Sequence, residues 1–156
     1  MSWIHLQAGI LRRLDGLATR LGRGQRAAAH LQTGLRGERE ALFHLRSLGY
    51  TVVARRWKTP RLRGDIDLVA WDGDWLCFVE VKTRGSRGII SAEAAIDEDK
   101  QIMLRRMARA YLRGFPEQVR DRIPVRFDVI SVYLLPAGSE FEVQKGAFPW
   151  TGFSPR

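Results

Sequence analysis

The chain has 156 residues, 45% of them hydrophobic and 28% charged, which excludes a disordered protein and favours one domain with a sizeable core. The formal net charge of +9 indicates a polyanionic partner, either nucleic acid or an anionic membrane surface. The single cysteine, Cys77, excludes an intramolecular disulfide and a cysteine-based zinc cluster. No apolar run reaches the length of a membrane span and no secretory h-region is visible, so we expect a cytoplasmic protein with no integral membrane segment.

Residues 1–33 are predicted to form a basic amphipathic helical extension. Ile10, Leu14 and Leu17 recur at helical spacing, with arginines between them. Such a helix can pack on the domain or fray at the terminus, lie on a membrane surface, or belong to an organelle transit peptide. The pattern alone leaves these roles open, and it shows no chemistry.

A second helix is predicted after this extension, ending at Gly49, a natural C-terminal stop. Ala41 and Leu42 lie on its apolar face, and Glu38 falls on the same inward face because it lies three and four residues earlier. An acid in the first turn of a helix is also favourable for the helix dipole. Glu38 is therefore open to a structural and a functional interpretation.

Residues 50–57 are rich in β-forming side chains and are predicted to form the first strand. The strand end and the following loop are basic and surround Trp57. This pattern is typical of a solvated charge run or of phosphate contacts with base stacking, and the total charge favours the second. The basic side chains concerned are Arg55, Arg56, Lys58, Arg61 and Arg63.

The stretch 64–84 predicts a hairpin, because two apolar runs flank an Asp-Gly turn. Side chains alternate faces along a strand, so Asp67 lies on one face of the first run, and Glu80 and Lys82 share one face of the second. Pairing across the hairpin can bring Asp67 close to Glu80 and Lys82. Charges inside apolar strands are costly to bury unless they pair or bind a metal.

Past the hairpin we expect a basic loop that carries Arg84 and Arg87, and a helix over residues 92–113 capped by Ser91. Lys100 shares the inward face of that helix, where a lysine either extends outward or reaches a central acidic site. Residues 127–135 predict a further strand, and 141–143 a short one. We expect Asp128 to pair with an arginine other than Arg126, which we place on the other side of the strand.

These residues suit metal-dependent phosphodiester hydrolysis. Two or three carboxylates can hold Mg²⁺ or Mn²⁺, and a metal polarises a phosphoryl oxygen and activates water. A lysine two residues after an acid can orient the nucleophile or stabilise negative charge. The chain has no phosphate loop ending in Gly-Lys-Ser/Thr, and its three histidines lack metal-ligand spacing. The specific signal is the whole set of Glu38, Asp67, Glu80 and Lys82.

With these motifs the chain resembles the bacterial YraN family of the PD-(D/E)XK, restriction-endonuclease-like class. The resemblance implies an α/β fold with an αβββαβ core, in which helices flank a mixed β-sheet, similar to archaeal Holliday-junction resolvases. It also implies a nuclease site at Glu38, Asp67, Glu80 and Lys82, with the three acids as ligands of Mg²⁺ or Mn²⁺. The matching pieces are Gly37-Glu38 with Ala41, residues 64–69, residues 78–84, Lys100 and residues 126–130.

Two functions are therefore carried forward. The first is a divalent-metal-dependent endonuclease acting on DNA, with a preference for particular DNA structures left open. The second is a non-catalytic nucleic-acid-binding protein that retains the nuclease fold. We expect a nuclease-like domain over 34–149 and a tail over 150–156, and we leave a homodimer and a membrane-surface adaptor open. The expected DNA-binding residues are Arg55, Arg56, Lys58, Arg61, Arg63, Arg84, Arg87 and Lys100.

Overall fold

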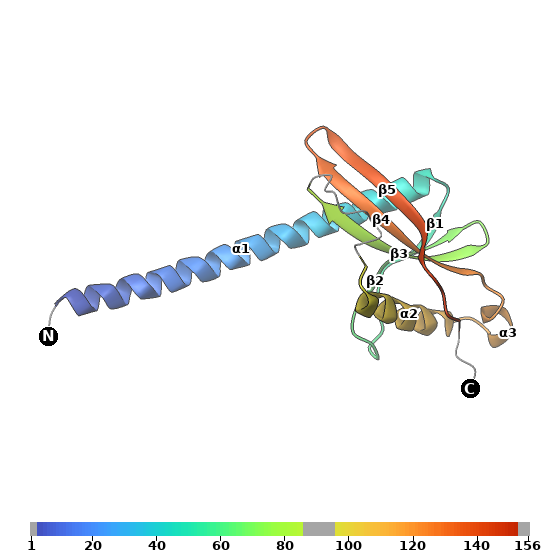
Figure 1. Cartoon of the computed structure of the whole chain (residues 1–156), viewed down its shortest axis with the longest axis horizontal. Helices are drawn as coiled ribbons and strands as arrows, with labels where there is room; N and C mark the ends of the chain where they lie inside the picture. The colour runs from blue at the N-terminus through green and yellow to red at the C-terminus, as the bar shows by residue number, and fades with distance from the viewer. Residues whose placement is uncertain (1–2, 86–95, 153–156) are drawn as a thin grey trace. The chain divides into compact units, whose positions relative to one another are not determined.

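The computed structural model describes residues 3–85 and 96–152, and their side chains from residue 24 onward. The elements are α1 (Trp3–Ser47), β1 (Thr51–Trp57), β2 (Ile66–Asp72), β3 (Trp75–Arg84), α2 (Glu98–Leu112), α3 (Glu117–Arg120), β4 (Val125–Leu135) and β5 (Gly138–Phe148), as Figure 1 shows. The expected α/β class is confirmed, with β5 extending the order to αβββαββ. By contacts the chain divides into two compact units, Met1–Leu35 and Arg36–Arg156.

Helix α1 is continuous where the sequence predicted two helices with a looser stretch between them. Glycines suggested the break, but a glycine inside a helix costs only about 1 kcal/mol relative to alanine, and no proline interrupts the hydrogen-bond ladder. The end of α1 follows the prediction more closely. Gly49 has a φ of 93°, which favours glycine, and its N–H donates to the Arg46 carbonyl at 3.0 Å.

The five strands form one mixed sheet in the order β1-β2-β3-β4-β5. Neighbouring strands run antiparallel except β3 and β4, which are parallel and are joined through α2. The Asp-Gly turn between β2 and β3 is confirmed, with Asp72 paired to Trp75 and Gly73 at a φ of 59°. Strand β5 is much longer than the expected 141–143, because it pairs with β4 along most of its length.

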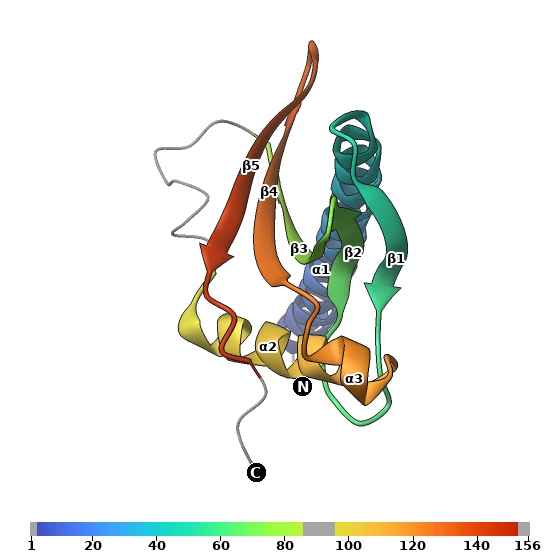
Figure 2. The same ribbon diagram turned by 90° about the vertical axis from the view of Figure 1, so that its right-hand side faces the viewer.

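Each face of the sheet has its own hydrophobic core. On one face Phe78 and Phe127 pack with α2, which contributes Leu104 and Met107. On the other face Val79 and Ile130 are among the strand residues that pack with the last turns of α1, from Ala41 to Leu45. Figure 2 shows α2 at the opposite end of the strands from the β4–β5 turn. The alternation of β3 side chains thus decides which helix each residue meets.

Helix α2 begins later than predicted. It starts at Glu98, and its cap is Asp97, whose Oδ1 accepts from the Lys100 N–H at 2.8 Å. The expected cap, Ser91, and the expected DNA contact, Arg87, lie outside the described residues. No helix in the part of the chain that the structure describes is both long and apolar enough to cross a membrane.

Candidate functional site

The site forms where β2 and β3 separate. Their antiparallel pairing ends at Leu68 and Val79, one residue from Asp67 and from Glu80. Beyond that point the side chain of Asp67 takes the place of a strand carbonyl, because its Oδ2 accepts from the Val81 N–H at 2.8 Å. This bond holds one oxygen of Asp67 beside the β3 backbone. Asp67 Oδ1 takes part in none of the hydrogen bonds among the described residues.

Glu80 is the buried centre of the site, with 5% of its surface exposed. Two lysines approach it from two elements. Lys82 Nζ, on the same strand, lies 3.3 Å from Oε1, and Lys100 Nζ, in the first turn of α2, lies 3.1 Å from Oε2. The Lys100 contact is an ion pair whose angles do not make a hydrogen bond, so Oε2 is buried without a hydrogen-bond partner among the described residues.

Glu38 reaches the site because α1 approaches β3 closely. Gly37 lies so near Thr83 that a Cβ at this position would collide with the threonine side chain. Glycine therefore permits an approach that sets the next residue, Glu38, beside the carboxylates. The Glu38 side chain is 15% exposed, and its Oε2 lies 3.6 Å from Nε of Arg56, a residue of β1 with a φ of 46°. The sequence had predicted Arg56 as a DNA contact, not as the partner of Glu38.

Two acids of the site, Asp67 and Glu38, have raised pKa values. Burial, and then the charge of Glu80, raise the pKa of Asp67 to about 7, although the Val81 N–H bond acts in the opposite direction. Burial also raises the pKa of Glu38, against the opposing effect of Arg56. The charges of Asp65 and Glu80 add to the increase at Glu38. Because the charge of Glu80 raises the pKa of both Asp67 and Glu38, and that of Glu38 also raises the pKa of Asp67, the three carboxyl groups share one electrostatic environment.

The structure therefore brings the four predicted residues into one neighbourhood with Lys100. We call Glu38, Asp67, Glu80, Lys82 and Lys100 the carboxylate–lysine cluster. Within the described ranges no three carboxylate, imidazole or thiol groups stand at metal-ligand geometry. The three carboxylates of the cluster still suit a hard cation, which prefers oxygen ligands. One of their oxygens, Glu80 Oε2, is buried without a hydrogen bond in the described residues.

The expected DNA-binding side chains lie on several elements: β1, the loop after it, β3 and α2. Lys58 is 64% exposed in its side chain and lies 3.9 Å from Asp65, and Arg55, Arg61 and Arg63 are exposed. The loop that carries Arg61 and Arg63 is held against α2 at Gly64, where a Cβ would collide with Met103. Arg84 is half-buried, and its Nε has no hydrogen-bond partner in the described part of the chain.

A second polar group of side chains lies on the opposite, α1-facing side of the sheet. We call Asp72, Arg126, Asp128 and Lys145, with Tyr50, the Arg126 cluster. Arg126 donates to both oxygens of Asp128, at 2.7 and 2.9 Å, and to Asp72 at 2.6 Å. The expectation that Arg126 points away from Asp128 is wrong, because residues two apart on a strand share a face.

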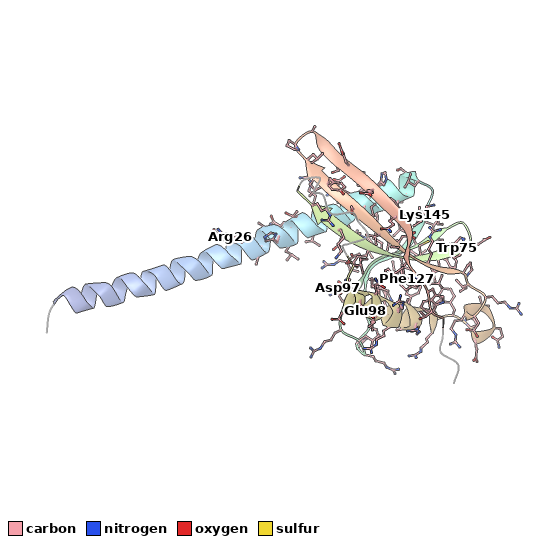
Figure 3. The ribbon with its side chains drawn as sticks, in the orientation of Figure 1. Arg26, Trp75, Asp97, Glu98, Phe127 and Lys145 are labelled. Atoms are coloured by element: carbon pink, nitrogen blue, oxygen red, sulfur yellow. The ribbon has the colours of Figure 1, made fainter. Side chains whose placement is uncertain are left out.

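The Arg126 cluster is closely hydrogen-bonded. Asp128, 1% exposed, also accepts from the Gly146 N–H at 3.0 Å and from the Tyr50 hydroxyl at 3.3 Å. Lys145 Nζ donates to Asp72 at 2.8 Å, and the pKa of Asp72 is lowered by the bonds from Lys145 and then Arg126. Figure 3 shows Lys145 apart from Asp97 and Glu98, which mark the start of α2.

Comparison with known proteins gives a consistent result. The model of the Uncharacterised protein family UPF0102 matches residues 37–132. A UPF0102 protein of Koribacter versatilis is 48% identical over 123 residues, which is 79% of this chain and 83% of that protein. A UPF0102 protein of Solibacter usitatus is 47% identical, over 72% of this chain and 82% of that protein. One of Porphyromonas gingivalis is 39% identical, over 78% of this chain and 87% of that protein. These names state no activity.

Proposed function

We propose that this chain, which belongs to the UPF0102 family, is a divalent-metal-dependent endonuclease that hydrolyses phosphodiester bonds in DNA. The expected YraN-like family is confirmed, whereas the PD-(D/E)XK class and the nuclease activity are part of this proposal. The name of the family carries no reaction, so the proposal rests on the site.

One observation carries the proposal: the carboxylates of Asp67, which is half-buried, and Glu80, which is buried, lie together with incomplete compensation. Burial and Glu80 hold the pKa of Asp67 at about 7, and Glu80 Oε2 lacks a hydrogen bond. An acid pair of this kind is unfavourable for the fold alone. A divalent cation would relieve it, since Mg²⁺ and Mn²⁺ prefer carboxylate oxygens.

Each side chain then has a defined task. Asp67 and Glu80 would hold the cation, with Glu38 as a further ligand, directly or through water. When bound, the cation polarises a phosphoryl oxygen and lowers the pKa of a water molecule. Lys82 cannot ligate the metal, because an ammonium only donates. Its position 3.3 Å from Glu80 suits it to hold the attacking water or to stabilise charge on the phosphate.

The basic surface supports nucleic acid as the substrate. Several exposed arginines stand on β1 and on the loop that packs against α2. Such side chains neutralise phosphates whatever the base sequence, so binding is expected to be salt-dependent and largely sequence-independent. The proposed DNA contacts in the described residues are Arg55, Arg56, Lys58, Arg61, Arg63, Arg84 and Lys100.

One observation favours the second candidate, a DNA-binding protein without catalysis. Lys82 and Lys100 both pair with Glu80, so two cations of the chain itself already offset this carboxylate. A structural salt-bridge cluster would need no metal. In that case Lys100 is a partner of Glu80 and takes no part in phosphate binding.

A cleavage assay separates the two functions. The whole chain is incubated with Mg²⁺ or Mn²⁺ and with linear, flapped, four-way and single-stranded DNA, and a parallel sample contains EDTA. We expect metal-dependent cleavage, and a loss of at least about 100-fold in Glu80→Gln, which keeps the shape of the side chain but removes its charge. DNA binding in Ca²⁺ should persist in this variant.

The matched control is Glu117→Gln, which removes an acid on α3 whose side chain is 79% exposed. It should cut at the wild-type rate. Tight DNA binding without cleavage of any of the four substrates, in either metal, would favour the binding protein. Cleavage that survives both EDTA and Glu80→Gln would refute the proposed site.

A further inference from the structure

Away from the carboxylate–lysine cluster, the loop after β1 and the side of α2 enclose a cavity of about 360 Å³. Four arginines line it, together with Thr59, Leu62 and Ala110, and no acidic side chain of residues 3–85 or 96–152 does. We call this cavity the arginine pocket, after Arg61, Arg106, Arg109 and Arg113. The carboxylates of the cluster do not contribute to it.

Arg106 and Arg109 of α2 and Arg113 at its C-cap form one stripe along the helix, since they are spaced by three and four residues. The opposite stripe of α2, with Leu104 and Met107, is buried against the sheet. The acids in the first turn of α2, Glu98 and Asp99, lie about two turns from Arg106, too far along the helix to pair with the stripe. Like charges on neighbouring turns destabilise a helix. An anion bound to the arginine stripe would offset this repulsion.

Among the described residues, Arg109 is the one guanidinium group of the four with protein partners. Arg109 donates to the Gly152 carbonyl at 2.9 Å and to the Thr151 hydroxyl at 2.7 Å, and it lies 5.3 Å from the Trp150 ring centroid. Arg109 is thus held as one wall of the pocket. Arg61, Arg106 and Arg113 are exposed, and none of them has an ion pair or side-chain hydrogen bond within the described residues. Within the described residues, their donors are open to a ligand.

We propose that the arginine pocket binds backbone phosphates of the DNA that the carboxylate–lysine cluster cleaves. Guanidinium groups from a loop and a helix, around an opening that no described acid lines, match the planar, bidentate recognition of phosphate oxygens. This inference rests on the proposed function for the identity of its ligand, and it adds a second anchoring point on the same DNA.

The distance between pocket and cluster fits one continuous strand. Along α2, at 1.5 Å per residue, Arg106 lies about 9 Å and Arg113 about 20 Å beyond Lys100, which contacts Glu80. Phosphates in one strand of a duplex are about 3.4 Å apart along its axis, so this span corresponds to about three to six phosphates. This axial span is compatible with one DNA strand that reaches both the pocket and, around the N-terminal end of α2, the cluster.

The test measures binding without requiring cleavage. The whole chain and the variant Arg106→Gln/Arg113→Gln are titrated with a fluorescent 24-base-pair duplex in EDTA, over a series of KCl concentrations. Two lost phosphate contacts should flatten the dependence of log K on log salt by about 1.8 and weaken binding roughly 30-fold at 0.15 M salt. Equal melting temperatures of the two proteins verify the fold. The matched control, Arg46→Gln/Arg122→Gln, removes the same charge from exposed positions elsewhere and should change the slope by less than half as much.

An unchanged slope in the pocket variant, or the same loss in the control, would overturn the inference. Vesicles of phosphatidylglycerol form a separate arm. Loss of vesicle binding in the pocket variant with unchanged DNA binding would assign the pocket to a membrane surface and also overturn it. A wild-type chain that binds DNA through the pocket but cuts no substrate would support the pocket while refuting the proposed nuclease.

Discussion

The carboxylate–lysine cluster and the Arg126 cluster lie on opposite faces of one sheet, and both combine buried acids with basic side chains. In the Arg126 cluster Asp128 accepts from a guanidinium, a backbone N–H and a hydroxyl, and the pKa of Asp72 is lowered. In the carboxylate–lysine cluster the pKa of Asp67 is raised to about 7, and an oxygen of Glu80 lacks a hydrogen bond.

The comparison indicates that the Arg126 cluster stabilises the fold, whereas the acids of the carboxylate–lysine cluster destabilise it. An acid that accepts hydrogen bonds from basic side chains, as Asp72 does, favours its charged form, whereas one that is desolvated beside another acid, as Asp67 is, opposes it. Unfavourable ionisation of this kind is more frequent at functional sites. Exchanging residues in each cluster therefore tests whether the two differ in role.

The largest effect is expected at Asp128. Asp128→Ala removes the acceptor of Arg126 and of the Gly146 N–H inside the core, so unfolding should become easier by about 3–5 kcal/mol and the melting temperature should fall by about 10 °C. The measurement is thermal and urea unfolding. Cleavage per folded molecule should stay at the wild-type rate, and a selective loss of rate would place the Arg126 cluster in the reaction.

Lys82→Ala should show the opposite pattern. Cleavage should fall by at least about 100-fold, as for removal of one electrostatic donor. Stability should change little, because Lys100 still pairs with Glu80. Single-turnover cleavage, Mn²⁺ affinity and melting temperature are measured on one preparation, with Lys145→Ala as the control. A folded, metal-binding variant that cuts at the wild-type rate would exclude Lys82 from the chemistry.

Metal affinity should depend on pH through Asp67. The carboxyl must lose its proton to bind a cation, so with a pKa of about 7 the Mn²⁺ association constant should rise about tenfold from pH 6 to pH 8. Isothermal titration at both pH values measures this change. In Asp67→Asn binding should be weak and independent of pH in this range. A flat profile in the wild type would show that Asp67 does not ligate the metal.

The metal-free protein should be stabilised by Asp67→Asn. An acid whose folded pKa lies above the ordinary 3.8 binds more protons when folded, so its contribution to stability falls as pH rises from about 3.8 to about 7. Asparagine keeps an acceptor for the Val81 N–H and carries no charge. At pH 8 in EDTA the variant should be more stable by at least about 1 kcal/mol, and near pH 4 the difference should shrink. A destabilised variant at pH 8 would show that the acid pair is not strained.

The smallest effect is expected at Lys145. Its side chain is 53% exposed, so its bond to Asp72 is screened by solvent, and Lys145→Gln should cost less than about 1 kcal/mol. Chemical unfolding measures the difference. A loss as large as that of Asp128→Ala would mean that the Arg126 cluster depends on its exposed member as much as on its buried one.

The sequence by itself determined the hairpin, the shared face of Glu80 and Lys82, and the inward face of Glu38, because strand alternation and helical spacing are local properties. The family was also visible in the motifs and is confirmed by the comparisons.

Only the tertiary structure decided which charges meet. Lys100 stands 20 residues after Glu80 in the chain, and its contact depends on how α2 lies across the sheet. Arg56 pairs with Glu38 because β1 and α1 approach each other, and the arginine pocket exists because a loop and a helix enclose it. Long-range packing sets these distances and the burial that raises the pKa of Asp67, and neither is encoded in the spacing of residues along one element.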